Sequence, residues 1–142
     1  MNENYNKAVN NLKISKVDYQ FYEFKLDENT PSELFTIDSL KQQGFQGVQS
    51  VIESVAESES EPTFWIYKFV YQVSIRFIQE SGDNEESKVI LQISADFLAS
   101  YTSSEQLVEE CLKEFATRHV GFHVWPYWRE AVQSASSKLG LT

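Results

Sequence analysis

Cysteine is nearly absent from this chain, which contains a single one, Cys111, among 142 residues. One thiol cannot form an internal disulfide or a multi-cysteine metal site, so a crosslinked scaffold is excluded. Glycine and proline are also scarce, at five and three residues, and no low-complexity segment is present. This composition excludes collagen-like and disordered proteins and suits a reducing cytoplasm.

Basic residues are in the minority, because 12 Lys and Arg face 21 Asp and Glu and leave a net charge of −9. Non-specific binding to nucleic-acid phosphate or anionic lipid needs a basic face, so neither partner is expected. No window is apolar over the length of a membrane-spanning helix, and the polar residues 1–11 lack the apolar core of a secretion signal. We therefore expect a soluble cytoplasmic protein without membrane insertion.

Apolar residues, by contrast, are abundant and regularly spaced, with hydrophobic residues at 42% and aromatic residues at 14%. The length fits one domain, which we place at residues 12–142 after a flexible N-terminal segment, residues 1–11. Apolar residues occupy every second position from Phe64 to Ile78 and again from Val89 to Tyr101. These matched faces predict two long antiparallel strands joined by a hairpin loop at residues 80–87.

Less regular segments precede this hairpin. Between Leu12 and Leu26 the apolar alternation shifts by one residue, which predicts a strand with a bulge near Phe21. Residues 33–47 follow no period and are assigned irregular structure, whereas residues 48–56 fit a strand or a helix equally well. The acidic residues between 53 and 61 are interpreted as a solvated turn or strand end, with an acidic docking surface as the alternative.

The last third of the chain shows helical spacing. Ser103 or Ser104 is expected to cap a first helix, which Gly121 ends, and a second helix is expected to begin at Trp125 and Pro126. Strands first and helices last predict an α+β fold, an antiparallel sheet of about four strands with the two C-terminal helices on one face. The apolar stripe of the first helix consists of Leu107, Val108, Cys111, Leu112, Phe115 and Ala116.

The start of the second helix carries a family motif. An apolar residue, Pro-Tyr, any residue and then Arg-Glu are found here as Trp125, Pro126, Tyr127, Arg129 and Glu130. This run resembles the SecB export-chaperone family and is most similar to the SecB-like chaperones that accompany toxin–antitoxin modules. The resemblance implies a SecB-like fold and a homotetramer, a dimer of dimers, that holds unfolded polypeptides in apolar grooves without ATP.

The same resemblance implies the partners. The clients would be preproteins or one dedicated client such as an antitoxin, and the sequence leaves this choice open. The chain stops at Thr142 without the basic, cysteine-bearing tail that helps the family engage the translocase motor SecA, which argues against SecA as a partner. We expect neither a cofactor nor a metal ion.

Aromatic residues are the natural contacts for an unfolded client. Each candidate also has an ordinary explanation, because apolar strand faces usually pack into a core or a subunit interface. Arg129 and Glu130 of the motif either bridge subunits or lie on the surface. The candidate client-binding residues are Trp65, Tyr67, Phe69 and Tyr71 of the long strand and Trp125, Tyr127 and Trp128 of the helix start.

Catalysis has little support in the sequence. His119 and His123 are four residues apart, but the helix break expected at Gly121 would separate them, so no metal site is predicted. Cys111 lies on the apolar stripe and is predicted to be a buried, inert thiol. We therefore predict a protein that is not an enzyme. The alternatives are a small-ligand-binding or enzymatic α+β domain with an apolar pocket on the sheet face, and an adaptor that has lost client binding.

Overall fold

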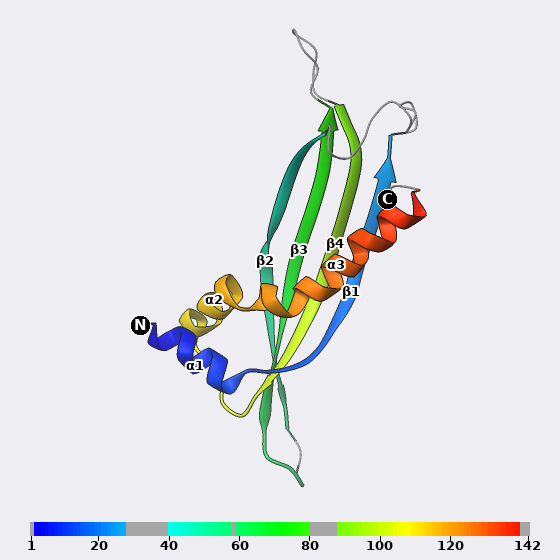
Figure 1. Ribbon diagram of the computed structural model, residues 1–142. Helices are drawn as coiled ribbons and strands as arrows, with labels where there is room; N and C mark the ends of the chain where they lie inside the picture. Colours follow the sequence, from blue (N-terminus) through cyan, green and yellow to red (C-terminus); the bar gives the residue numbers. More distant parts are fainter. Residues whose placement is uncertain (1, 28–39, 58, 80–87, 140–142) are drawn as a thin grey trace.

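A computed structural model describes residues 2–27, 40–57, 59–79 and 88–139 of the chain (Figure 1). The predicted hairpin loop at residues 80–87 lies outside these described residues, as do residues 33–39 of the segment assigned irregular structure. None of the helices in the described ranges is long and apolar enough to cross a membrane. The elements in chain order are α1 (Glu3–Asn11), β1 (Lys13–Leu26), β2 (Lys41–Ala56), β3 (Phe64–Gln79), β4 (Lys88–Ser103), α2 (Glu109–Arg118) and α3 (Val120–Lys138).

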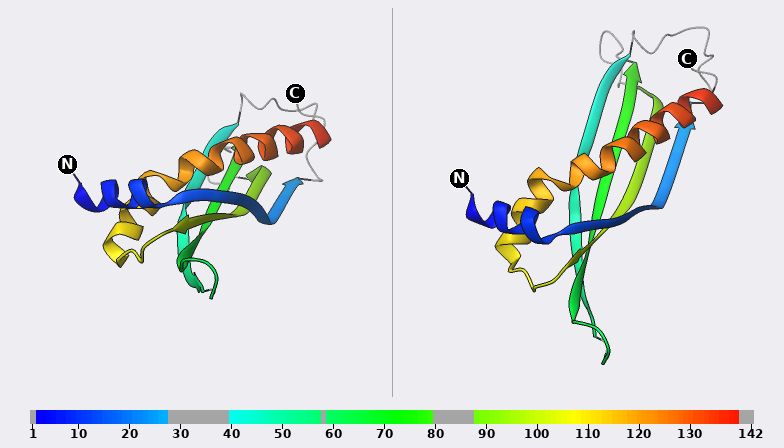
Figure 2. Two further views of the ribbon diagram at one scale, coloured as in Figure 1. Left: turned by 90° about the horizontal axis from the view of Figure 1, so that it is seen from below. Right: turned by 60° about the horizontal axis from the view of Figure 1, so that its bottom comes forward.

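The four strands form one antiparallel sheet in the order β1-β4-β3-β2. The hairpin of β3 and β4 lies at its centre, and pairs such as Tyr67 with Tyr101 and Phe69 with Ala99 place the apolar residues of both strands on one face. That face is covered by the helices, and α3 crosses it obliquely (Figures 1 and 2). The predicted α+β class and the central hairpin are confirmed.

Edge strand β1 contains the bulge that the phase shift predicts. Its pairing with β4 changes register between Tyr19 and Phe21. As a result both Tyr19 and Tyr22 face α3, where their hydroxyls donate to the carbonyl oxygens of Tyr127 at 3.0 Å and Ala131 at 2.6 Å. The bulge therefore allows two tyrosines of this edge to bond to the long helix.

The other edge strand, β2, differs from the structure predicted for these residues. Residues 48–56 are strand, and the strand already begins at Lys41, within the segment assigned irregular structure. A register shift between Val48 and Ser50 disrupts the apolar period of β2. The strand forms because β3 offers a long edge for pairing, and such tertiary pairing overrides the weak strand propensity of glycine and glutamine.

The helix boundaries also differ from expectation. Ser103 ends β4, and its hydroxyl donates to the Glu105 carbonyl at 2.6 Å instead of capping a helix. Helix α2 begins at Glu109, and α3 begins at Val120, so Pro126 lies inside α3 and does not start it. The chain breaks at His119 because Phe115 and Val120, 1% and 0% exposed, can both reach the core only if the helix axis changes direction between them.

The N-terminal segment is a helix, α1, where a flexible segment was expected. The Asn2 side chain caps it by accepting from the Tyr5 backbone N–H at 3.0 Å. Ala8 and Leu12 are buried, and α1 packs beside α2. Only a few apolar residues make this contact, so the polar, asparagine-rich sequence of the segment did not predict the helix.

Candidate functional site

Two grooves lie between edge strand β2 and the helices. The first, here called the α2 groove, has a volume of about 1270 Å³ and runs between β2, α2 and the start of α3. The second, the α3 groove, has a volume of about 620 Å³ and runs between β2, β3 and α3. Gln46 and Trp125 line both, so the grooves form one continuous surface. The apolar lining of the α2 groove consists of Val48, Val51, Tyr71, Leu112, Ala116, Phe122 and Trp125.

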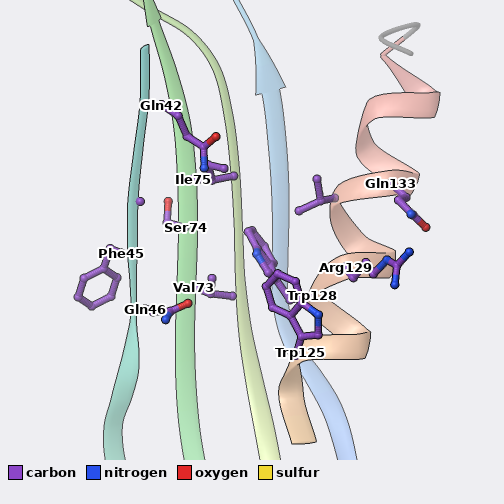
Figure 3. A pocket seen from close by; sticks show the side chains of 12 residues that line it. Gln42, Phe45, Gln46, Val73, Ser74, Ile75, Trp125, Trp128, Arg129 and Gln133 are labelled. Carbon is purple, nitrogen blue, oxygen red and sulfur yellow. The ribbon is translucent and has the colours of Figure 1, made fainter. Parts of the chain in front are cut away.

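The α3 groove is built from tryptophans of α3 and side chains of the strands (Figure 3). Trp125 and Trp128 extend from the helix toward the sheet, where Val73 and Ile75 of β3 lie, whereas the Phe45 ring of β2 points away from the helix. Arg129 and Gln133 add polar groups along α3. The α3 side of the groove is therefore aromatic, and polar side chains lie beside the aromatic ones.

Large aromatic side chains in these grooves remain exposed. Phe122 is 73% exposed and Trp125 57%. Water contact of this extent is unfavourable for rings, and contiguous exposed apolar surface marks sites that bind an apolar partner. The groove surface is therefore suited to holding apolar side chains of another molecule.

The candidate residues from the sequence divide between the grooves and the core. Tyr71, Trp125 and Trp128 line the grooves. Tyr67 and Phe69 are fully buried, with the Tyr67 hydroxyl accepting from the Leu107 backbone N–H at 2.8 Å. Trp65 is half-buried and Tyr127 is 37% exposed, and neither lines either groove.

The remaining motif residues divide between the α3 groove and the exposed surface of α3. Arg129 lines the α3 groove, whereas Pro126 and Glu130 are exposed and line neither groove. Burial, and after it the Glu130 carboxylate, raises the pKa of Tyr19. Within the motif, Arg129 therefore lies at the α3 groove, whereas Glu130 lies near Tyr19 of edge strand β1.

Several groove residues were not predicted as site residues. Leu112 and Ala116 were assigned to the packing stripe of the helix, and Gln42 and Gln46 lie in the segment that was interpreted as irregular. Phe122 lies next to the expected helix end and carried no periodic signal. Their shared feature is proximity to β2, an edge strand that the sequence pattern did not reveal.

The two histidines come together, contrary to the expected break between them. Their ring centroids are 5.0 Å apart, because the helix break falls at His119 and His123 lies one turn later. The hydroxyls of Tyr5 and Tyr101 bond to Nδ1 of His119 at 3.0 Å and of His123 at 2.8 Å. Burial lowers the pKa of both histidines, and His119 lowers that of His123 further.

The two histidines and the thiol make their polar contacts within the fold. Across the described ranges, no three His, Cys, Asp or Glu side chains gather in a way that could hold a metal ion. Cys111 is buried as predicted, and its Sγ lies 3.7 Å from Asn4 Oδ1. Both features connect α1 to the rest of the fold, which is a structural role.

Comparison with known proteins identifies the type of fold. No protein-family model matches the sequence, and no curated protein matches it either. Among solved structures, the chain is similar to the Mycobacterium tuberculosis Rv1957 SecB-like chaperone in complex with a ChAD peptide from the Rv1956 HigA1 antitoxin. The TM-score is 0.62 at 14% identity, over 99% of this chain and 92% of that one. The chain has a SecB-like fold, as the motif at Trp125–Glu130 predicted.

Proposed function

We propose that this protein is a SecB-like chaperone that binds non-native polypeptide in the α2 and α3 grooves. The observation that carries the proposal is the continuous groove surface with two strongly exposed rings, Phe122 and Trp125. A folded monomer gains nothing from leaving these rings in water. A client that buries them gains about 25 cal/mol for each Å² of apolar surface removed from water.

The form of the groove favours an extended client over a small ligand. The groove follows β2, a strand of 16 residues at the edge of the sheet, whose outer backbone groups have no neighbouring strand within the described chain. An extended segment could pair with such an edge while its side chains enter the apolar groove. Many weak contacts of this kind bind sequences of varied composition.

Finer points of the proposal rest on the family resemblance. We propose that binding needs no ATP, that the protein assembles as a homotetramer in the cytoplasm, and that it catalyses no reaction. A client such as an antitoxin is favoured over preproteins, because the similar mycobacterial chaperone was solved with an antitoxin peptide. The net charge of −9 would keep the loaded chaperone soluble.

An aggregation assay tests the proposal. A heat-denatured reporter protein is followed by light scattering without nucleotide, in the presence of the wild type or of Phe122→Ala with Trp125→Ala. We expect the wild type to suppress aggregation and the double variant to suppress it much less. Ile52→Ala is the matched control, since Ile52 is 52% exposed but lies on the opposite face of β2, paired with Lys68.

The outcomes separate the proposal from its alternatives. A wild type that leaves aggregation unchanged refutes client holding. Equal suppression by wild type and double variant removes these two rings from the site. Native mass from size exclusion with light scattering, measured for each variant, shows whether any loss arises from a broken assembly.

A further inference from the structure

Tyrosine hydroxyls beneath the helices are paired, with one exception. The Tyr67 hydroxyl accepts from the Leu107 backbone, and the Tyr101 hydroxyl bonds to His123. Tyr71 is only 9% exposed, yet its hydroxyl has no hydrogen-bond partner among the described residues. An unpaired polar group is unfavourable once it is sealed from water, so a molecule that fills the space above this hydroxyl must supply a hydrogen-bond partner for it.

The hydroxyl of Tyr71 is accessible from the α2 groove. Tyr71 lines this groove, and the only fully enclosed, unpartnered side-chain oxygen in the described ranges is Ser100 Oγ, so Tyr71 Oη is not sealed off. Gly121 of α3 keeps it uncovered, because a Cβ at that position would lie 3.1 Å from the Tyr71 hydroxyl oxygen. A larger residue at Gly121 would close the groove over the hydroxyl.

We propose that the Tyr71 hydroxyl is the polar anchor of the α2 groove and donates a hydrogen bond to a main-chain carbonyl of an extended polypeptide bound there. This inference rests on the proposed function and assigns a specific contact within it. An extended client brings unpaired carbonyls against the apolar walls formed by Val48 and Leu112. Each such carbonyl needs a donor, and the unpaired hydroxyl supplies one.

A main-chain acceptor is the ligand chemistry that fits this site. Burial is the only cause that raises the pKa of Tyr71, so the phenol stays protonated and can donate. The charged residues that line the groove, such as Lys113 and Arg118, are exposed and form ion pairs with Glu109 and Glu114. The anchor at the buried end is therefore neutral, which suits a backbone carbonyl common to every client.

Removal of one oxygen atom tests the anchor. Tyr71→Phe is compared with the wild type for affinity toward a fluorescein-labelled synthetic peptide of alternating leucine and serine, and for thermal stability. We expect affinity to fall by about 3- to 10-fold, the range of one neutral hydrogen bond. The melting temperature should not fall, because no internal bond is lost. Gly121→Ala, which covers the hydroxyl, should weaken binding similarly.

Tyr22→Phe is the matched control. It removes the same atom, but the Tyr22 hydroxyl bonds internally to the Ala131 carbonyl and lies outside both grooves. We expect this variant to lose stability and to keep its peptide affinity. The opposite pattern, with Tyr22→Phe weakening the peptide and Tyr71→Phe leaving it unchanged, overturns the anchor.

A peptide series identifies the acceptor. Each peptide carries one ester in place of an amide, and the ester carbonyl is the weaker acceptor. In the wild type one position should lose more affinity than the others, and this difference should vanish in Tyr71→Phe. If Trp125→Ala weakens binding while Tyr71→Phe does not, the anchor alone is refuted. If the wild type binds none of the peptides, the proposed function fails with it.

Discussion

The Phe115 ring packs α2 against the sheet, and truncation of this side chain tests whether the α2 groove depends on that contact. The ring is 1% exposed, and its centroid lies 5.6 Å from that of Phe69 and 5.0 Å from that of Tyr101, which it meets edge-on. On its other side it lies 4.9 Å from the His119 ring. Since α2 forms one wall of the groove, we expect Phe115→Ala to lower both stability and peptide affinity.

The expected loss follows from the burial of this ring. A fully buried phenylalanine truncated to alanine costs about 3–5 kcal/mol, and the edge-on contact with Tyr101 accounts for about 0.5–1.5 kcal/mol of it. The free energy of unfolding of a domain is typically about 5–15 kcal/mol, so the variant should still fold but with a much smaller free energy of unfolding. Phe115→Leu keeps most of the apolar volume and should cost roughly 1.5 kcal/mol.

Urea unfolding at one fixed protein concentration measures this loss through tryptophan fluorescence. Phe122→Ala is the control for stability, because that ring is 73% exposed and its truncation should change the free energy of unfolding by less than about 0.5 kcal/mol. Equal destabilisation by both variants would refute the assignment of Phe115 to the core. If Phe115→Ala is destabilised but binds peptide as the wild type does, α2 does not form the client-binding wall.

Two further predictions concern α3 and its start. Pro126→Ala restores a backbone N–H that can donate to the Phe122 carbonyl, and because the proline is exposed, we expect a melting temperature a few degrees higher; a fall would show that the ring makes a necessary contact. His119 and His123 have a lowered pKa in the folded chain, so the unfolded chain binds more protons, and the free energy of unfolding should fall as the pH drops below about 6.5 and level off below the folded pKa values. Replacement of both by glutamine should flatten the melting profile between about pH 7.5 and 5.5, and an unchanged profile contradicts this.

The centre of the fold could be predicted from the sequence because burial there follows a strict period. In β3 and β4 every second residue is apolar, and a slip of one residue would send all of them to the solvent, so the pairing of Phe69 with Ala99 is determined by the pattern itself. The bulge at Phe21 was visible for the same reason, as a shift in an otherwise regular period. Fold identity depended on a different signal, the short motif around Pro126 and Tyr127.

The edge strand and the helix ends could not be predicted in this way. Edge strand β2 pairs on one side only, and from Lys41 to Gly47 it is mostly glutamine and glycine, so pairing with β3 determines its structure more than its own residues do. The Ser103 hydroxyl bonds to Glu105 in a turn, although its spacing resembles a helix cap. In both places a local pattern allowed two structures and the tertiary contacts selected one.

The client-binding surface depends on one such boundary. Phe115 and Phe122 are seven residues apart, and in a continuous helix two turns would bring them to the same face, where both would join the core. The break at His119 changes the direction of the helix between them, so Phe115 is 1% exposed and Phe122 73%. Periodicity can identify both rings as apolar but cannot show that the axis turns between them. The exposed aromatic groove therefore results from the position of a helix break, which is determined by the packing of Phe115 and Val120 against the sheet.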